Sequence, residues 1–510
     1  MSGRRHNRRT LLLTLQALSL GLAACTNPML LQGAGRLNPA SPAPSPASNG
    51  PSPAASPDAG PTAPPEGFAF TWSGLPMVTR RLEVSLASGD TVIASTSLTP
   101  GVATWDPGVA PGATLSLEVR AHDETRLVAV GTASVVPADG SRTSVELAFQ
   151  PTVWMVAGTE PSVENFTEGQ QALVTPLPRI THLLSGTRDT LVLGACTRQS
   201  SWFRFLTLGP DGRLMSIAGN GNSPGVMPEE ASAREVALKV PTYVTLGPDG
   251  NLWFKVPDQG LFRLTTGTGT SSRWPNLPPG TLRRELQQLP GGHSIEGLAA
   301  MPDGSLVIVA ADPDYSYSTI WRANPVPGAT MDLQPWFGGH PLTDRDPREG
   351  DDVSNLLSFY GGEPVVAPDG GILLRGYSPE ALWYLPATDG PAFGRPMRAG
   401  HLHDLRPALR QALPPVDPGF SSFEGPIAFA RDGSLLITSN NDSVILRLDR
   451  QTGHVSPLLG DPGMVRTLLP ISGTLARSQR LSFVYNLAVK PDGRVFVLDG
   501  NPASLYELAL

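Results

Sequence analysis

A turn of Pro-Asp-Gly or Arg-Asp-Gly, followed by a short apolar run, recurs through the second half of the chain. Pro presets φ for the turn, Asp can bond to its own backbone, and Gly accepts a positive φ. β-prone runs lie on both sides of each turn, which predicts a hairpin at each copy. The turn aspartates are Asp249, Asp303, Asp369, Asp432 and Asp492.

The spacing of these turns predicts the architecture. Successive turn aspartates lie 54, 66, 63 and 60 residues apart, and a degenerate copy at Asp189 precedes Asp249 by 60 residues. Pro210-Asp211-Gly212 falls between two copies and reads as a second hairpin of the same unit. A period of this length with four strands per unit is typical of a β-propeller blade. Six such units predict an all-β, six-bladed β-propeller.

The two ends of the repeat region are expected to meet in one blade. The chain ends after Leu505–Leu508, which would be the third strand of the last blade. Val153–Val156, at the start of the repeat region, would then supply the fourth strand. Such a closure removes the open sheet edge that an unpaired strand would expose.

The first 25 residues read as a targeting segment. Arginines at positions 4, 5, 8 and 9 precede the apolar stretch Leu11–Leu22, which is too short to span a bilayer as a mature helix. The sequence Leu22-Ala-Ala-Cys25 resembles the lipobox of bacterial lipoproteins, whose cysteine is lipidated. An ordinary signal peptide with an incidental cysteine is the alternative. The resemblance implies a lipid anchor on Cys25 in the bacterial cell envelope, at the outer membrane or the cell surface.

Composition divides the remaining chain. Residues 26–66 are rich in Pro, Ala and Ser and predict a tether. Residues 67–151 hold six or seven short alternating strands, which predict a small immunoglobulin-like β-sandwich domain. Residues 152–510 form the expected propeller. The net charge is −7 and no basic block follows residue 9, so we expect no nucleic-acid partner. We also expect a monomer.

One passage adds a family resemblance. Ser216–Asn222, an Ala-containing stretch and then Pro241–Trp253 resemble the unit of NHL-repeat propellers. In that family an Ala-Gly-rich outer strand leads through a loop to a Pro that opens the next blade. The resemblance implies the propeller fold, which serves binding platforms and enzymes alike.

Polar residues open the innermost strands when the blades are aligned on their turns. These residues are Arg179, Thr242, Glu296, Glu363, Glu424 and Asn486. Three carboxylates and an amide make an all-oxygen set that suits Ca²⁺ or another divalent cation. The predicted metal ligands are therefore Glu296, Glu363, Glu424 and Asn486. A polar lining of the channel without a metal is the alternative reading.

Two of these positions resemble a second family. Glu424-Gly-Pro426 and Asn486 are similar to metal-binding positions of gluconolactonase-type propellers, although Leu487 stands where that family has Gly. No residue matches that family's catalytic aspartate, so the catalytic residues are unknown. We expect a surface-anchored binding platform for a protein, glycan or small molecule, and whether the chain is an enzyme stays open. The alternative is an exported metal-dependent lactonase-like hydrolase.

Overall fold

The computed structural model describes most of the chain after residue 66. The described residues are 67–139, 141–158, 168–174, 176–186, 190–196, 202–266, 274–275, 277–313, 318–326, 331–338, 347–353, 361–377, 380–412, 425–439, 444–460, 472–479, 481, 483–500 and 503–510. Cys25 and the predicted tether lie outside them, as does Glu424. The described residues divide at Thr152 into two compact units.

The first unit is a small all-β domain. Its strands are β1 (Phe68–Ser73), β2 (Arg81–Ser88), β3 (Thr91–Leu98), β4 (Thr104–Trp105), β5 (Leu115–His122), β6 (Leu127–Val135) and the first part of β7 (Thr143–Ala157). One sheet has the order β3-β2-β5-β6-β7, and β1 pairs with β4 and, in parallel, with β7. Leu82, Val84 and Leu86 are buried on one face of β2 while the residues between them keep part of their surface accessible. This alternation is that of a half-buried sheet.

The second unit begins with two blades made of consecutive hairpins. The first holds β8 (Arg179–Ser185), β9 (Leu191–Cys196), β10 (Phe203–Leu208) and β11 (Leu214–Ala218) after the short helix η1 (Ala172–Val174). The second holds β13 (Tyr243–Leu246), β14 (Leu252–Val256), β15 (Gly260–Leu264) and β16 (Thr281–Leu286). A further short strand, β12 (Glu230–Ser232), pairs with the outer edge of β16. This short strand therefore extends the sheet of the second blade to five strands.

The next three blades repeat the antiparallel pattern. The third holds β17 (Ser294–Ala300), β18 (Leu306–Ala311), β19 (Ser318–Asn324) and β20 (Asp332–Gly338), after η2 (Pro290–Gly292). The fourth holds β21 (Gly361–Val366), β22 (Ile372–Tyr377), β23 (Glu380–Leu385) and β26 (His403–Asp404), with the separate hairpin β24 (Gly390–Ala392) and β25 (Arg395–Met397). The fifth holds β27 (Ile427–Phe429), β28 (Leu435–Ser439), β29 (Val444–Leu448) and β30 (Val455–Leu459), after α2 (Arg406–Ala412).

The last blade joins the two ends of the unit. It holds β32 (Val484–Val489), β33 (Arg494–Gly500) and β34 (Ala503–Ala509), after β31 (Thr474–Leu475) and η4 (Ala476–Ser478). Its fourth strand is the second part of β7, in which Val153 pairs with Leu508 and Ala157 with Leu505. The predicted closure is confirmed, and β34 has a partner on both sides.

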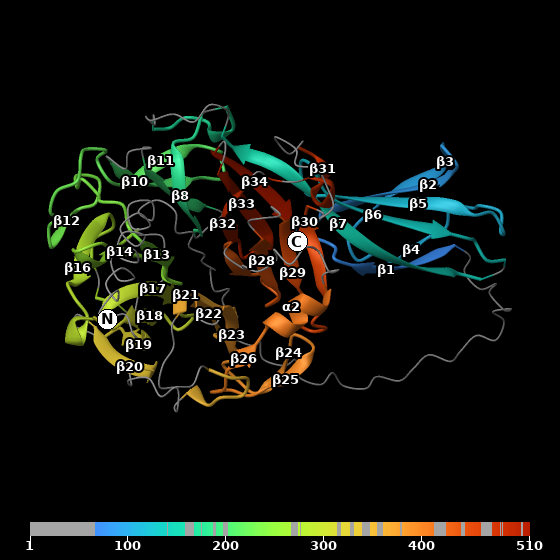
Figure 1. Ribbon diagram of the computed structural model, residues 1–510. Coiled ribbons are helices and arrows are strands. Elements are labelled where there is room, and N and C mark those ends of the chain that lie inside the picture. Colours follow the sequence, from blue (N-terminus) through green and yellow to red (C-terminus); the bar gives the residue numbers. More distant parts are fainter. Residues whose placement is uncertain are drawn as a thin grey trace, which may run out of the picture. The chain divides into compact units, whose positions relative to one another are not determined.

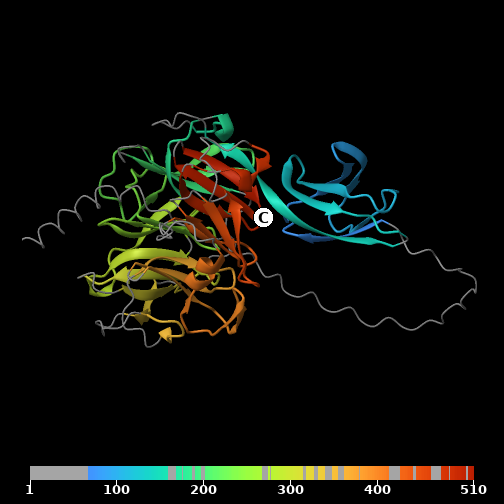
Figure 2. The same ribbon diagram turned by 45° about the vertical axis from the view of Figure 1, so that its right-hand side comes forward.

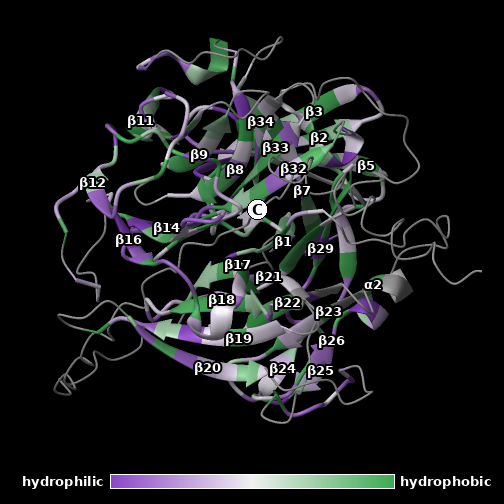
Figure 3. Cartoon of the chain, turned by 60° about the vertical axis from the view of Figure 1, so that its left-hand side comes forward, coloured by the Kyte–Doolittle hydropathy of each residue, from purple (hydrophilic) through white to green (hydrophobic). Residues whose placement is uncertain are grey.

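The sheets are arranged as blades around one axis (Figure 1, Figure 2). Their innermost strands contact one another in the order β8, β13, β17, β21, β27 and β32, and β32 contacts β8. The innermost strand β17 is mainly hydrophobic, whereas the outermost strands β16 and β20 carry more hydrophilic residues (Figure 3). The predicted all-β fold class and its β-propeller are confirmed, and the described strands form six sheets whose innermost strands contact one another in sequence.

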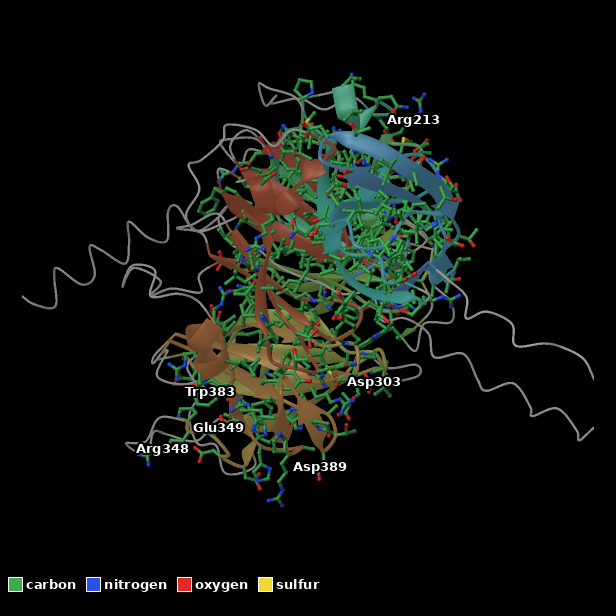
Figure 4. All side chains as sticks on the ribbon, turned by 90° about the vertical axis from the view of Figure 1, so that its right-hand side faces the viewer. Arg213, Asp303, Arg348, Glu349, Trp383 and Asp389 are labelled. Atoms are coloured by element: carbon green, nitrogen blue, oxygen red, sulfur yellow. The ribbon has the colours of Figure 1, made fainter. Side chains whose placement is uncertain are left out.

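Each described turn aspartate bonds to the backbone of its own turn, as the sequence predicted. The Oδ1 atom of Asp303 accepts a hydrogen bond from the backbone N–H of Ser305 at 2.9 Å, and Asp303 lies at the turn between β17 and β18 (Figure 4). The same bond to the residue two positions on is made by the other turn aspartates, Asp211, Asp249, Asp369, Asp432 and Asp492. Each glycine that follows has a positive φ, which a glycine accepts without steric cost. Among the described residues the repeat is thus a hairpin turn that occurs once in each blade, and Asp189, the expected degenerate copy, lies outside them.

Candidate functional site

The candidate site is built at the beginnings of the innermost strands. In four of these strands the pairing with the second strand shifts near its start, which is a β-bulge. The bulges lie between Ile180 and His182, Ile295 and Gly297, Gly361 and Pro364, and Val484 and Asn486. A bulge re-aims the side chains beside it and is common next to binding sites. Polar residues occupy or directly follow these bulges, and they include three of the predicted ligands.

Glu296 occupies the bulge of β17 and is already hydrogen bonded. Its Oε1 accepts from the hydroxyl of Ser294 at 2.9 Å, and its Oε2 accepts from the hydroxyl of Tyr243 on the neighbouring β13 at 3.2 Å. Lys255 on β14 lies opposite Tyr243 in the strand register. Burial lowers the pKa of Lys255, and the negative charge of Glu296 opposes that shift. The Glu296 carboxylate therefore joins two blades through hydroxyl groups and lies close to an ammonium group.

Glu363 occupies the bulge of β21. Its Oε1 is buried and makes no hydrogen bond to any residue that the structure describes. Burial raises the pKa of Glu363 to about 8, against an opposing effect of Arg375. The strands β17 and β21 approach closely here, because a Cβ on Gly297 would lie 2.7 Å from Cδ of Pro364. Glu363 is therefore a neutral carboxylic acid at neutral pH, held by tight packing.

His182 directly follows the bulge of β8, and its ring is 2% exposed. The Thr181 hydroxyl donates to the carbonyl of Gly194 at 3.2 Å and lies 2.9 Å from Nδ1 of His182. The ring of His182 also makes a hydrogen bond with the backbone of Thr242, which directly precedes β13 in the second blade. Burial lowers the pKa of His182 to about 3, with the backbone of Thr242 opposing the shift. The ring is therefore neutral and buried, and Thr181 and the backbone of Thr242 hold it in place.

Asn486 directly follows the bulge of β32, at the position equivalent to His182, and is 0% exposed. Its Oδ1 accepts from the backbone N–H of Leu487 at 2.9 Å, which fixes the orientation of the amide. Its Nδ2 is buried and makes no hydrogen bond within the part of the chain that is described. Asn486 therefore offers a donor, where the metal prediction needed an oxygen.

The sequence missed His182 for a physical reason. The first blade has no complete Pro-Asp-Gly turn between its first two strands, so its alignment pointed to Arg179, the first residue of β8. The β-bulge adds one residue to the strand, and this changes which side chain falls at the equivalent position. Thr242, the corresponding prediction in the second blade, directly precedes β13 and donates its N–H to the carbonyl of Lys255. An alignment on the second strands, which carry no bulge, could have found His182.

The three described members of the predicted metal set are hydrogen bonded or buried, and their fit to a divalent cation stays a prediction. Ca²⁺ takes six to eight oxygen ligands. Both oxygens of Glu296 accept hydroxyl hydrogen bonds, Glu363 is protonated at neutral pH, and Asn486 directs its oxygen to its own backbone. Among the described residues no three His, Cys, Asp or Glu side chains are placed to hold a metal ion. Glu424 is not described, so the set as a whole stays a prediction.

The closely spaced histidines His401 and His403 belong to a structural feature of the fourth blade. His401 and His403 flank Leu402, a spacing that can chelate a metal in an extended strand. Nδ1 of His403 instead donates to Oε1 of Glu349 at 2.9 Å, and its Nε2 accepts from the backbone N–H of Arg398 at 3.0 Å. Glu349 also accepts from the backbone N–H of Asp404 (Figure 4 labels Glu349). The histidine thus fixes a loop of the fourth blade.

Comparison with known proteins gives structural neighbours without a family. No protein-family model and no curated protein sequence matches the chain. A gluconolactonase from Xanthomonas campestris is 12% identical with a TM-score of 0.34, covering 69% of this chain and 98% of its own. Regucalcin, a calcium-binding protein from Agrobacterium tumefaciens, is 11% identical with a TM-score of 0.36, covering 68% and 95%. A Bacteroides thetaiotaomicron protein of unknown function is 11% identical with a TM-score of 0.31, covering 84% and 90%.

These neighbours do not show which family the chain belongs to. The membership of the NHL-repeat family, which the sequence resembles, stays a prediction. Chemically, the described beginnings of the innermost strands offer one donor (Asn486 Nδ2) and one neutral acid (Glu363). Such a set can hold a polar ligand by hydrogen bonds without a net charge of its own.

Proposed function

We propose that the propeller is a binding platform for a small polar ligand. The observation that carries this proposal is the presence of two buried polar atoms, on two innermost strands, that have no hydrogen-bond partner among the described residues: Glu363 Oε1 and Asn486 Nδ2. Leaving a buried donor or acceptor unsatisfied costs about 1–3 kcal/mol, so a fold retains such groups for a reason. A ligand that satisfies them would recover this cost on binding.

The protonation and hydrogen bonding of these groups favour a binding function over the lactonase-like alternative. A metal-dependent hydrolase needs ionised oxygen ligands around its cation. The described residues at the beginnings of the innermost strands are instead neutral or already hydrogen bonded, and Lys255 adds a positive charge beside Glu296. The proposal therefore involves no metal and no bond-breaking step.

A thermal-shift screen tests the platform. A ligand that binds only the folded chain raises the melting temperature by mass action. We expect some neutral polar compounds of a small-molecule library to raise the melting temperature of the wild type and to leave Asn486→Leu unshifted. Asn220→Leu, which changes a half-buried asparagine of another loop, is the control and should respond as the wild type does. If every stabilising compound shifts Asn486→Leu equally, the binding site lies elsewhere.

We also propose that a lipid on Cys25 holds the protein on the membrane of a bacterial cell envelope, at the outer membrane or the cell surface. The lipobox-like Leu22-Ala-Ala-Cys25 and the Pro-rich segment 26–66 support this. Among the described residues no helix has the length and apolar character needed to cross a membrane. The protein would act as a monomer, and its net charge of −7 makes nucleic acid an unsuitable partner.

Replacing the lipidated cysteine should release the protein. We expect Cys25→Ala to move from the membrane fraction to the soluble fraction of the cell, because the variant has no thiol to acylate. The chain has only one other cysteine, Cys196, which is buried, so Cys196→Ala is the matched control and should stay with the membrane. A wild type without lipid by mass spectrometry, or a Cys25→Ala variant that stays in the membrane fraction, would refute the anchor.

A further inference from the structure

The first unit leaves one long strand edge open. Among the described residues β3 pairs with β2 on one side and with no strand on the other, so it forms the margin of its sheet (Figure 1). None of its eight residues is buried. A β-bulge at Ile93 interrupts the pairing with β2, and Ala94–Leu98 then pair in regular register. The backbone N–H and C=O groups that point away from β2 along Ala94–Leu98, the open edge, can therefore pair with a further strand.

The outermost strands of the described blades are protected against such pairing, whereas β3 is not. β12 has three residues, and β26 and β31 have two each. β20 and β30 each contain a proline, which cannot donate a hydrogen bond to a further strand. In β11 the carbonyl of Ser216 already accepts from Nε of Arg234 at 2.9 Å. Short edges, prolines, charges and covering side chains prevent edge-to-edge association, and β3 contains no proline and no charged residue.

The charges nearest to β3 are paired with one another. Glu83 on β2 lies opposite Ser97 of β3 in the strand register. Its Oε1 is 2.9 Å from Nη2 of Arg81, and its Oε2 is 3.2 Å from Nε2 of His122 on β5. These side chains therefore offer little attraction to a charged partner, and the hydroxyl-rich open edge has no charge of its own. Charge complementarity thus favours an uncharged strand beside β3.

A second copy of the chain matches this edge poorly. Two β3 strands related by a two-fold axis would pair antiparallel. When the open edge pairs with itself in this way, Val92 of one chain falls beside Pro100 of the other. Val92 and Ile93 are 60% and 46% exposed, and a proline has no N–H with which to extend the pairing over them. A different strand with β-branched residues at these positions would cover both side chains.

We propose that β3 receives an extended, uncharged segment of a partner protein as an added β-strand. The backbone of the segment pairs with the open edge, and its β-branched residues cover Val92 and Ile93. In this mode of recognition the main-chain hydrogen bonds supply the affinity, and the match of side chains supplies the specificity. The inference goes beyond ligand binding by the propeller, because it makes the first unit a docking domain for a protein.

A panel of fluorescently labelled peptides tests this inference with the full chain. The peptides alternate valine or isoleucine with serine or threonine, and each has one counterpart with added lysines and one with an N-methylated backbone. Fluorescence anisotropy should show binding of uncharged peptides. We expect a loss of about tenfold or more in affinity for both kinds of counterpart and for the chain variants Ile93→Lys and Ser95→Lys, since a charge or a blocked N–H opposes strand addition.

Val136→Lys is the matched control for these variants. Val136 is 50% exposed in the same unit and lies outside β3, so this variant should bind the peptides as the wild type does. Ile93 and Ser95 are also exposed, so lysine at either position leaves the core of the sheet unchanged. Thermal unfolding of each variant confirms that it melts as the wild type does.

The outcomes distinguish an added strand from other contacts. Uncharged peptides that bind the wild type, and that lose affinity on N-methylation and in both lysine variants of β3, support the inference. No binding by any peptide, equal binding of the N-methylated forms, or equal binding by the β3 variants overturns it. Sedimentation velocity tests the second copy. A wild type that dimerises, with an Ile93→Lys variant that stays monomeric, would show that β3 pairs with itself and would also overturn the inference.

Discussion

Replacing Arg263 by methionine should lower the free energy of unfolding of the propeller by about 3–5 kcal/mol. The side chains of Arg263 on β15 and Glu285 on β16 are both 0% exposed, and their Nε and Oε1 atoms lie 2.7 Å apart. The variant would leave the carboxylate of Glu285 buried, with only the longer 3.8 Å contact from Arg283 to its Oε2. It would also remove the guanidinium from the face of Trp253. Chemical denaturation followed by fluorescence measures the loss.

Two comparisons control for other causes. Arg284→Met removes a neighbouring pair whose partner, Glu229, is 85% exposed, and it should cost less than about 1 kcal/mol. The double variant Arg263→Met with Glu285→Leu should recover part of the loss, because no buried charge is then left unpaired. Equal losses for Arg263→Met and Arg284→Met would show that the buried pair contributes no more than an exposed one.

The fold could be predicted because its signals are local and repeated. Each turn aspartate makes the backbone bond that its sequence context implies, and each blade repeats the hairpin that follows. The closure could also be predicted, because an unpaired edge beside β34 would be costly in any propeller. The strand β12 could not be predicted, because Glu230–Ser232 lie in a stretch whose sequence is typical of a loop. They form a strand only by pairing with β16.

The site could be predicted in position but not in chemistry. Glu296, Glu363 and Asn486 do lie at the beginnings of innermost strands, as the turn alignment indicated. Their chemical state depends on burial and on hydroxyl partners such as Tyr243, which come from other strands. A β-bulge also shifts by one residue the side chain that falls at a given strand position, and the regular spacing of the turn motifs does not reveal this shift. The neutral character of this site therefore had to come from the structure.

Replacing Glu363 by glutamine should stabilise the propeller at neutral pH by about 2–4 kcal/mol, since one pKa unit corresponds to about 1.4 kcal/mol. The folded pKa of Glu363 is about 8 against an ordinary value of 4.5, so the native state binds more protons between these pH values. The contribution of Glu363 to the free energy of unfolding is therefore fully present below pH 4.5, and it is lost as the pH rises toward 8. Glutamine has the same shape and does not ionise, so Glu363→Gln should lack this fall.

His182 provides the control with the opposite sign. Its folded pKa is about 3 against an ordinary value of 6.5, so the unfolded state binds more protons between these pH values. Its contribution is complete above pH 6.5 and is lost as pH falls toward 3. His182→Phe should therefore lose the acid dependence of stability and keep the alkaline fall, whereas Glu363→Gln should do the reverse. Melting temperatures across the pH range distinguish the two variants.

The most direct test is the melting temperature of the wild type and of Glu363→Gln at neutral pH, in calcium and in EDTA. If the beginnings of the innermost strands form a neutral, hydrogen-bonding site, Glu363→Gln melts several degrees above the wild type, and calcium shifts neither protein. If they form a cation site, calcium raises the wild-type melting temperature, EDTA reverses the rise, and Glu363→Gln shows a smaller response or none. That second result, or a Glu363→Gln variant that melts below the wild type, would contradict the neutral site.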